Sequence, residues 1–219
     1  IRKKGKAELP VPGDSSEYGW EGYIPYDELP RVVNPSNGFI ATANNEVVGA
    51  EYPYHLSNIW AQPYRYERIV EMLEASDKLT VQDMKDLQMD AKNLYAIEFL
   101  PSLLGTIEAS VDAKYQDAIA ALKDWNYFDT TEQAAPLIFH HLMSELQESL
   151  FINEMPEDVY ELMPGKAQIL GEMLRDAYAG ETVQWIEKRG GLEKFVITAF
   201  EKSMNHLSDE YGANVSKWQ

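Results

Sequence analysis

Hydrophobic positions recur with a helical period only in the later part of the chain. From about residue 64 onward, apolar side chains return at intervals of three and four residues, as on one face of an α-helix. Residues 1–63 lack this period and are rich in proline, glycine, asparagine and aromatic residues. The pattern predicts a mainly α protein, with an extended, loop-rich segment over residues 1–63 and a helical domain over residues 64–219.

Apolar spacing and helix-breaking residues together predict the individual helices. Thr80 followed by Asp83 is typical of a helix start, and Pro101 is expected to end or kink the helix that begins there. Gly190 and Gly191 are expected to separate two helices, and Gly212 is expected to end the last helix. Helices are expected over residues 64–75, from Thr80 toward Pro101, and over residues 111–125, 136–151, 166–178, 182–188 and 192–211.

The loop-rich segment contains a turn, an extended stretch and a pair of amides. Pro35 fixes φ and Gly38 permits a positive φ, so a tight turn is predicted around them. Residues 39–42 favour an extended backbone, and a short strand there would carry Asn44 and Asn45 at its end. An amide held in this way can donate a hydrogen bond to an oxyanion, although no nucleophile is obvious in the chain.

The charge balance disfavours several classes of partner. The 219 residues include 36 acidic and 19 basic side chains, which give a net charge of −17. Nucleic-acid binding needs a basic surface, so we expect no nucleic-acid partner and no membrane partner. The absence of cysteine excludes disulfides and thiol catalysis. Because the first residue is Ile1 rather than methionine, we expect an excised or processed piece of a longer polypeptide.

Several motifs follow one another in an informative order. The stretch from Trp20 to Pro25 leads to the Asn-Pro turn and the two asparagines, and then to Tyr52-Pro53-Tyr54 and residues 64–69. This order resembles the middle of the β-chain of the penicillin acylase (penicillin amidase) family. Family members are N-terminal-nucleophile hydrolases, in which a serine at the start of the β-chain uses its own α-amine as base. The resemblance implies a fragment of an amidohydrolase that acts on penicillin or a related N-acyl compound, without the nucleophile.

The resemblance also implies two site residues. Asn44, the first of the amide pair, would donate to the oxyanion, and Arg65, at the start of a helix, would help to hold the site. From the residues alone, Asn44 could instead cap its own backbone, and Arg65 could pair with Glu67 or Glu71. Asn45 could orient Asn44 or simply terminate the strand.

Partners, cofactors and location follow for the parent enzyme. The resemblance implies a small-molecule amide substrate, contacts with the rest of the β-chain and with an α-chain, and a secreted or periplasmic location. Some members bind calcium through a carboxylate between the amide pair and the arginine. Here the only acids in that segment are Glu46 and Glu51, and the expected aspartate falls near Tyr54 or His55. We therefore expect no cofactor in this chain, with calcium possible in the parent enzyme.

One other interpretation of the whole chain stays open. The chain could be a stand-alone acidic helical module that binds a partner or ligand without catalysis. A metal site at His140 and His141 with Glu145 is disfavoured, because adjacent helical residues diverge by about 100° and no third ligand is in reach. We expect one of these histidines to be solvated and the other half-buried.

Overall fold

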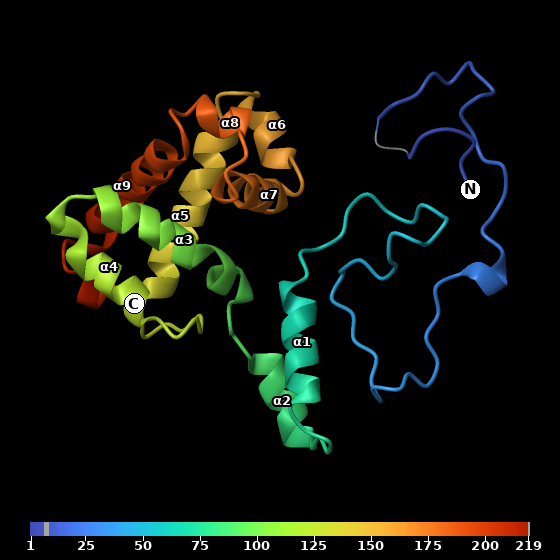
Figure 1. Cartoon of the computed structure of the whole chain (residues 1–219), viewed down its shortest axis with the longest axis horizontal. Helices are drawn as coiled ribbons and strands as arrows, with labels where there is room; N and C mark the ends of the chain where they lie inside the picture. Colours follow the sequence, from blue (N-terminus) through green and yellow to red (C-terminus); the bar gives the residue numbers. More distant parts are fainter. Residues whose placement is uncertain (7–8, 219) are drawn as a thin grey trace. The chain divides into compact units, whose positions relative to one another are not determined.

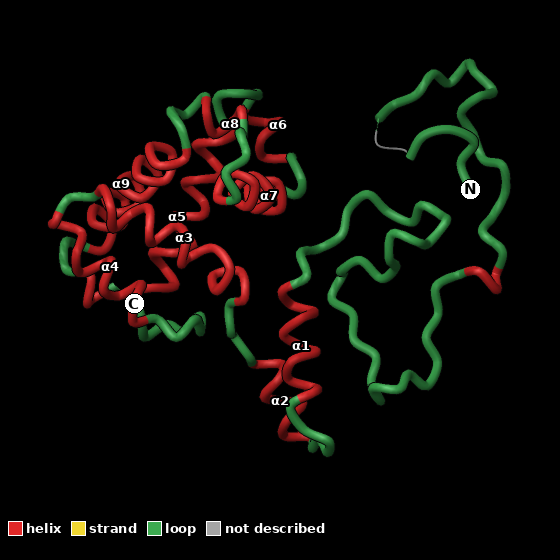
Figure 2. Tube along the Cα trace, in the orientation of Figure 1, coloured by secondary structure: helices red, strands yellow, loops and turns green. Residues whose placement is uncertain are grey.

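Helices make up the regular secondary structure of this computed structural model, which describes residues 1–6 and 9–218. Figure 2 draws no strand in the described residues, where antiparallel pairing is limited to two isolated bridges. The mainly α prediction is confirmed. The short strand expected over residues 39–42 is not formed, because an extended segment becomes a strand only when a neighbouring strand pairs with it.

The chain divides into two compact units, residues 1–88 and residues 89–219. The sequence predicts a division into residues 1–63 and 64–219, which coincides with the start of the first α-helix. This division stays a prediction. The first unit is mostly loop, with a 3-10 turn η1 (Tyr26–Glu28), followed by α1 (Tyr64–Glu74) and α2 (Val81–Met89).

The start of α2 is the capping box that the sequence predicts. The backbone N–H of Thr80 donates to the Asp83 carboxylate at 2.6 Å, and the N–H of Asp83 donates to the Thr80 hydroxyl at 3.2 Å. The Thr80 hydroxyl also donates to this carboxylate, at 2.7 Å, and this bond together with that from the Thr80 N–H holds the pKa of Asp83 below its usual value.

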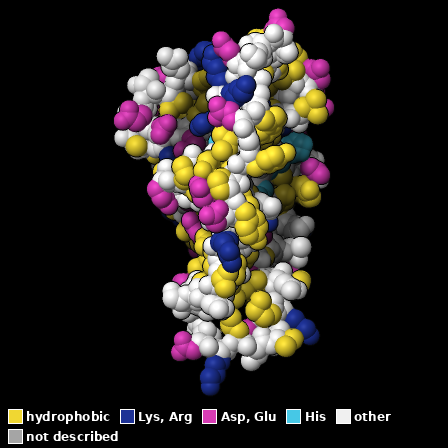
Figure 3. Space-filling view, turned by 90° about the vertical axis from the view of Figure 1, so that its right-hand side faces the viewer, with side chains coloured by type: hydrophobic (Ala, Val, Ile, Leu, Met, Phe, Trp, Pro, Cys, Tyr) yellow, Lys and Arg dark blue, Asp and Glu magenta, His cyan; other side chains and the backbone are white. Residues whose placement is uncertain are grey.

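The first unit has very few buried side chains. Among its described residues only Ala43 and Asn45 are buried, while Tyr23 is 94% exposed and Trp20 is 69% exposed. Hydrophobic side chains also lie at the surface, between charged ones, on the face drawn in Figure 3. Hydrophobic burial within this unit is therefore too small to fix its conformation, and polar contacts carry much of that role.

The second unit is a bundle of helices around α5 (Figure 1). Its helices are α3 (Leu94–Ser110), α4 (Gln116–Asp124), α5 (Ala134–Phe151), α6 (Glu157–Leu162), α7 (Lys166–Tyr178), α8 (Gln184–Glu187) and α9 (Leu192–Tyr211), with 3-10 turns η2 (Ala113–Tyr115) and η3 (Val215–Lys217). Within the described residues, no helix combines the length and the apolar character needed to cross a membrane.

The core of this unit forms where α5 packs against α9, α4 and α7. Ile138, Leu142, Leu146 and Leu150 follow one another at intervals of four residues on α5, and all four are fully buried. They face apolar residues of α9 such as Phe200, which is also fully buried. Because each such side chain contributes about 1.5–3 kcal/mol when buried, this packing is the main source of the unit's stability.

The single helix expected from Thr80 toward Pro101 is wrong, because the chain forms two helices there, with a break between α2 and α3. Pro101 lies inside α3 and does not end it. Asn93 starts α3 by accepting a hydrogen bond from the N–H of Ala96 at 2.8 Å. Pro101 lies on the exposed side of α3, where water can bond the carbonyl that proline leaves without a donor.

A polar contact is built into the packing of α5 against α9. The Nδ1 of His141 lies 3.0 Å from the hydroxyl of Ser203, which is fully buried. The ring of His141 also stacks on that of His206, with 4.6 Å between ring centroids. His140 is exposed and His141 is half-buried, so the expectation for the adjacent histidines is confirmed.

Burial and then the neighbouring His206 lower the pKa of His141 below its usual value of 6.5. The native protein therefore binds fewer protons than the unfolded chain just below pH 6.5. The contribution of His141 to stability is complete above that pH, and it is lost as the pH falls toward the native pKa.

We expect the substitution His206→Gln to raise the pKa of His141, because it removes a like charge. The substitution should also weaken the pH dependence of the unfolding free energy between about pH 7.5 and 5.5. NMR titration of the histidine ring protons measures the first effect, and urea denaturation at several pH values measures the second. His55→Gln, at an exposed position in the first unit, is the matched control. A His141 pKa above 6.5 in the unsubstituted chain would contradict the prediction.

Candidate active site

The two residues that the sequence singles out are in direct contact. The Nη2 of Arg65 donates one hydrogen bond to the Oδ1 of Asn44 and another to the carbonyl of Ala43, each at 2.9 Å. Arg65 is the second residue of α1, so the first turn of this helix presents the guanidinium to the loop. The contact brings the two residues to one place, while their catalytic role stays a prediction.

This contact fixes which way the Asn44 amide faces. Arginine carries only donors, so the atom of Asn44 that faces Arg65 is the oxygen. The Nδ2 group therefore points away from the guanidinium, and it has no hydrogen-bond partner among the described residues. Asn44 is exposed. The arrangement leaves an oriented amide donor open to a ligand.

The backbone of Asn44 contributes to this orientation. Its φ of 63° lies in the left-handed region, which asparagine tolerates better than most residues. Its carbonyl accepts a hydrogen bond from the N–H of Ala61 at 2.7 Å. Asn44 is thus held by two hydrogen bonds, one to its backbone carbonyl and one to its side-chain oxygen.

Asn45 shapes the loop from inside. Its Oδ1 accepts a hydrogen bond from the N–H of Ala43 at 3.0 Å, and its Nδ2 donates to the carbonyl of Glu46 at 2.8 Å. Both bonds go to neighbouring backbone, and the residue is only 9% exposed. Of the adjacent asparagines, Asn45 is the local structural amide and Asn44 is the outward one.

The simpler alternatives for the two residues are not observed. Glu71 pairs with Arg68 at 2.9 Å, and no ion pair joins Arg65 to Glu67 or Glu71 among the described residues. The oxygen of Asn44 bonds the guanidinium instead of capping its own backbone.

The segment between Asn44 and Arg65 does not fit a calcium ion. Glu46 and Glu51 are exposed, and the hydroxyl of Tyr54 donates to the carboxylate of Glu28 at 2.5 Å. Within residues 1–6 and 9–218, no three histidine or acidic side chains are grouped so that they could hold a metal. Because calcium requires six to eight oxygen ligands, the side chains of this segment do not make a calcium site.

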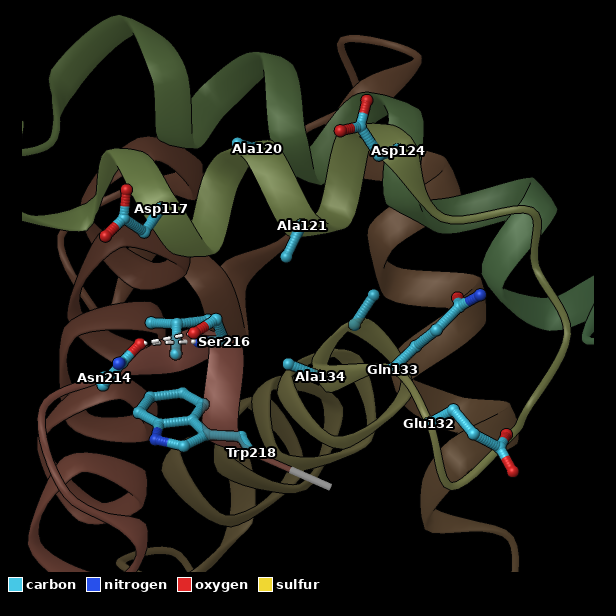
Figure 4. Close-up of a pocket in the computed structure, with 12 residues that line it drawn as sticks. Asp117, Ala120, Ala121, Asp124, Glu132, Gln133, Ala134, Asn214, Ser216 and Trp218 are labelled. Carbon is cyan, nitrogen blue, oxygen red and sulfur yellow. Dashed lines mark hydrogen bonds between the residues drawn. The ribbon is translucent and has the colours of Figure 1, made fainter.

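A cleft lies in the second unit, between α4 and the turn η3 (Figure 4). Asp117, Asp124 and Glu132 are its charged lining residues, and the hydroxyl of Ser216 donates to the Oδ1 of Asn214 at 2.7 Å. No histidine is among the residues that line this cleft, so Ser216 has no neighbouring imidazole base. The acidic lining would also repel an oxyanion. The cleft therefore does not fit acyl transfer.

Comparison with known proteins gives a consistent family. The profile of the family described as penicillin amidase matches residues 1–219. A penicillin acylase 2 proenzyme from a Pseudomonas strain is 44% identical over 89 residues, which cover 41% of this chain and 12% of that protein. The acyl-homoserine lactone acylase QuiP of Pseudomonas aeruginosa is 30% identical over 171 residues, which cover 72% of this chain and 20% of that protein.

More distant similarities extend over nearly the whole chain. Penicillin G acylase of Escherichia coli is 24% identical over 242 aligned positions, covering 96% of this chain and 28% of that protein. The chain thus spans less than a third of the length of these curated relatives. A thermostable penicillin G acylase from Alcaligenes faecalis superposes with a TM-score of 0.73 at 18% identity, covering 100% of this chain and 45% of that one. The fold is shared with this solved enzyme.

Removing the guanidinium should loosen the loop around Asn44. We expect Arg65→Met to speed amide hydrogen exchange at Ala61 and Ala43 by about threefold to tenfold, because hydrogen bonds from a charged donor are lost at a partly exposed site. Arg31→Met, at an exposed position in the same unit, is the matched control. Equal exchange rates in the two variants would show that Arg65 does not hold the loop.

Proposed function

The chain belongs to the penicillin amidase family, and we propose that it is part of an enzyme that hydrolyses an amide between an acyl group and an amine. The relatives named as acylases of penicillin and of acyl-homoserine lactones support this class of reaction. The observation that carries the proposal for these residues is the exposed amide of Asn44, held by Arg65 at 2.9 Å.

In this proposal Asn44 stabilises the tetrahedral intermediate. Attack on the amide carbonyl moves negative charge onto its oxygen, and a donor that is already oriented lowers the energy of that state. The Nδ2 group of Asn44 is suited to this task because it has no competing partner among the described residues. Such a donor contributes roughly 3 kcal/mol to transition-state stabilisation.

Arg65 is a positioning residue in the same proposal. It acts through Asn44, because its hydrogen bond to Oδ1 keeps the amide from turning its oxygen toward the substrate oxyanion. The Asn44 side chain would lie between the guanidinium and the oxyanion, and the attraction between these opposite charges would further stabilise the intermediate. The carbonyl of Ala43 fixes the guanidinium by accepting the second hydrogen bond.

We assign the nucleophile to an N-terminal serine of the parent β-chain. Its hydroxyl would attack the carbonyl carbon while its α-amine accepts the proton. The amine would pass that proton to the leaving nitrogen, and water would then release the acyl group from the serine. Ser15 and Ser16 cannot replace it, because their backbone nitrogens are amides without basic character.

In the complete enzyme, we expect Asn44→Ala to lower kcat by about 10²-fold or more, as for loss of other oxyanion donors. Asn44→Asp should cause a similar loss even though it keeps an oxygen for Arg65, because it removes the N–H donor. Asn37→Ala, at an exposed position in the same segment, serves as control. Steady-state kinetics on a phenylacetyl amide measure these effects, and an unchanged kcat in Asn44→Asp would remove Asn44 from the catalytic residues.

The isolated 219-residue chain should show no amide hydrolysis. An oxyanion donor without a nucleophile can polarise a carbonyl but cannot form the acyl-enzyme. Purified chain would be assayed against phenylacetyl, glutaryl and long-chain acyl amides, with a serine-directed reagent as a check for contaminating enzyme. Turnover that persists through purification and disappears when a residue of this chain is substituted would overturn the proposed division of the active site.

A further inference from the structure

A cleft of about 230 Å³ lies in the second unit, where the last turns of α5 meet the first turns of α9. Its lining includes three cations, Arg189, Lys194 and Lys202, and one carboxylate, Glu148. This excess of positive charge is unusual in a chain whose net charge is −17. The cleft is therefore a local positive region on an acidic protein.

The two lysines belong to one face of α9. Lys194, Thr198 and Lys202 follow at intervals of four residues, and all three line the cleft. The lysines are separated by about 12 Å along the helix axis, and the side chain of Lys194 extends back over Gly190, toward the start of α9. Both lysines are exposed, and neither has an ion-pair partner among the described residues.

The opposite wall of the cleft is the C-terminal end of α5, where unpaired carbonyls would normally repel an anion. Arg189 covers this end. Its Nε donates to the carbonyl of Ser149 and its Nη2 donates to the carbonyl of Leu150, each at 2.7 Å. Glu154 pairs with Arg189 at 3.1 Å and with Lys188 at 3.2 Å. The cation thus covers the end of the helix, and the carboxylate that balances it does not engage the lysines of α9.

Neutral donors complete the lining. The hydroxyl of Ser149 is buried without a hydrogen-bond partner among the described residues, which is unfavourable for a polar group. Ser149, Asn153 and Thr198 are the neutral polar residues that line the cleft. Ammonium groups combined with several neutral donors suit a ligand with negative charge spread over several oxygens.

We propose that this cleft binds a small phosphate-type oxyanion, with Lys194 and Lys202 as its charged ligands and Thr198 between them. Glu148 opposes the ligand's charge and weakens its binding. The ligand is inorganic phosphate or the phosphate group of a small monoester. By bridging α9 and the end of α5, it stabilises the second unit. This site is separate from amide hydrolysis and does not depend on the proposed function.

The test is a titration of the 219-residue chain with inorganic phosphate at constant ionic strength, because screening alone changes the stability of an acidic protein. We expect saturable binding by calorimetry, a rise in Tm with phosphate concentration, and NMR shifts confined to residues 148–153 and 189–202. Glycerol phosphate forms a second arm. Tighter binding of inorganic phosphate assigns the site to the free ion, and tighter binding of the ester assigns it to a monoester.

Substitutions make the test specific to the cleft. Lys194→Gln and Lys202→Gln should each weaken phosphate binding about tenfold, and Thr198→Val should weaken it less. Glu148→Gln should tighten it, because it removes the opposing charge. Lys217→Gln removes an equal charge from an exposed position outside the cleft and should change nothing.

Binding that is not saturable, or phosphate shifts spread over lysines throughout the chain, would overturn the proposal. An equal loss in Lys217→Gln and Lys194→Gln would also overturn it, because the effect would then follow net charge. Circular dichroism of each variant verifies that the helices are retained. The substituted lysines and Thr198 are exposed, so their side chains contribute little to the core.

Discussion

The guanidinium of Arg65 is the constraint on which the candidate site depends. The surrounding loop has little apolar burial, and no strand pairs with it among the described residues. Its shape at Asn44 comes from polar contacts: the two bonds from Arg65, the bond from Ala61 and the local bonds of Asn45. Because the first turn of α1 carries the guanidinium, a rigid helix fixes the direction of an amide in an irregular loop.

The long helices were predictable from the sequence because each buries a continuous apolar face between clear breaks. The expected ranges for α7 and α9 match the observed ones, and α5 begins two residues earlier than expected. Gly212 ends α9 with a positive φ, as its position suggests. The short helix α6 was missed, since six residues are too few to establish a period.

The errors around α2 and α3 have a different cause. Apolar residues at positions 84, 87, 91 and 94 keep a helical spacing across this region, so periodicity alone favours one helix there. Asn93, however, hydrogen-bonds the carboxylate of Asp129 and the backbone of Ala96, and the N–H of Asn93 donates to the carbonyl of Tyr127. These contacts join residues far apart in sequence, and they favour a break that local spacing does not encode.

The candidate site was only partly readable from the sequence. The resemblance selected Asn44 and Arg65, whereas the residues alone could not show which asparagine of the pair faces outward. That depends on the left-handed backbone of Asn44, which turns one amide toward Arg65 while the next is buried. In the cleft lined by Lys194 and Lys202, the spacing of the α9 residues is visible in the sequence. The hydrogen bonds from Arg189 to the carbonyls at the C-terminal end of α5 are not.

The uneven burial of the two units has a consequence for how this protein can change during evolution. A substitution on the inner face of α5 lowers the free energy of unfolding, because a smaller side chain at Leu142 or Leu146 leaves a cavity. Most side chains of residues 1–63 lie outside any core. Many substitutions there therefore leave the protein's stability above the threshold that function requires. Selection could therefore change this loop almost independently of the helical unit. Ala43, Asn44 and Asn45 would then be the fixed positions in an otherwise variable segment, together with Arg65 of α1.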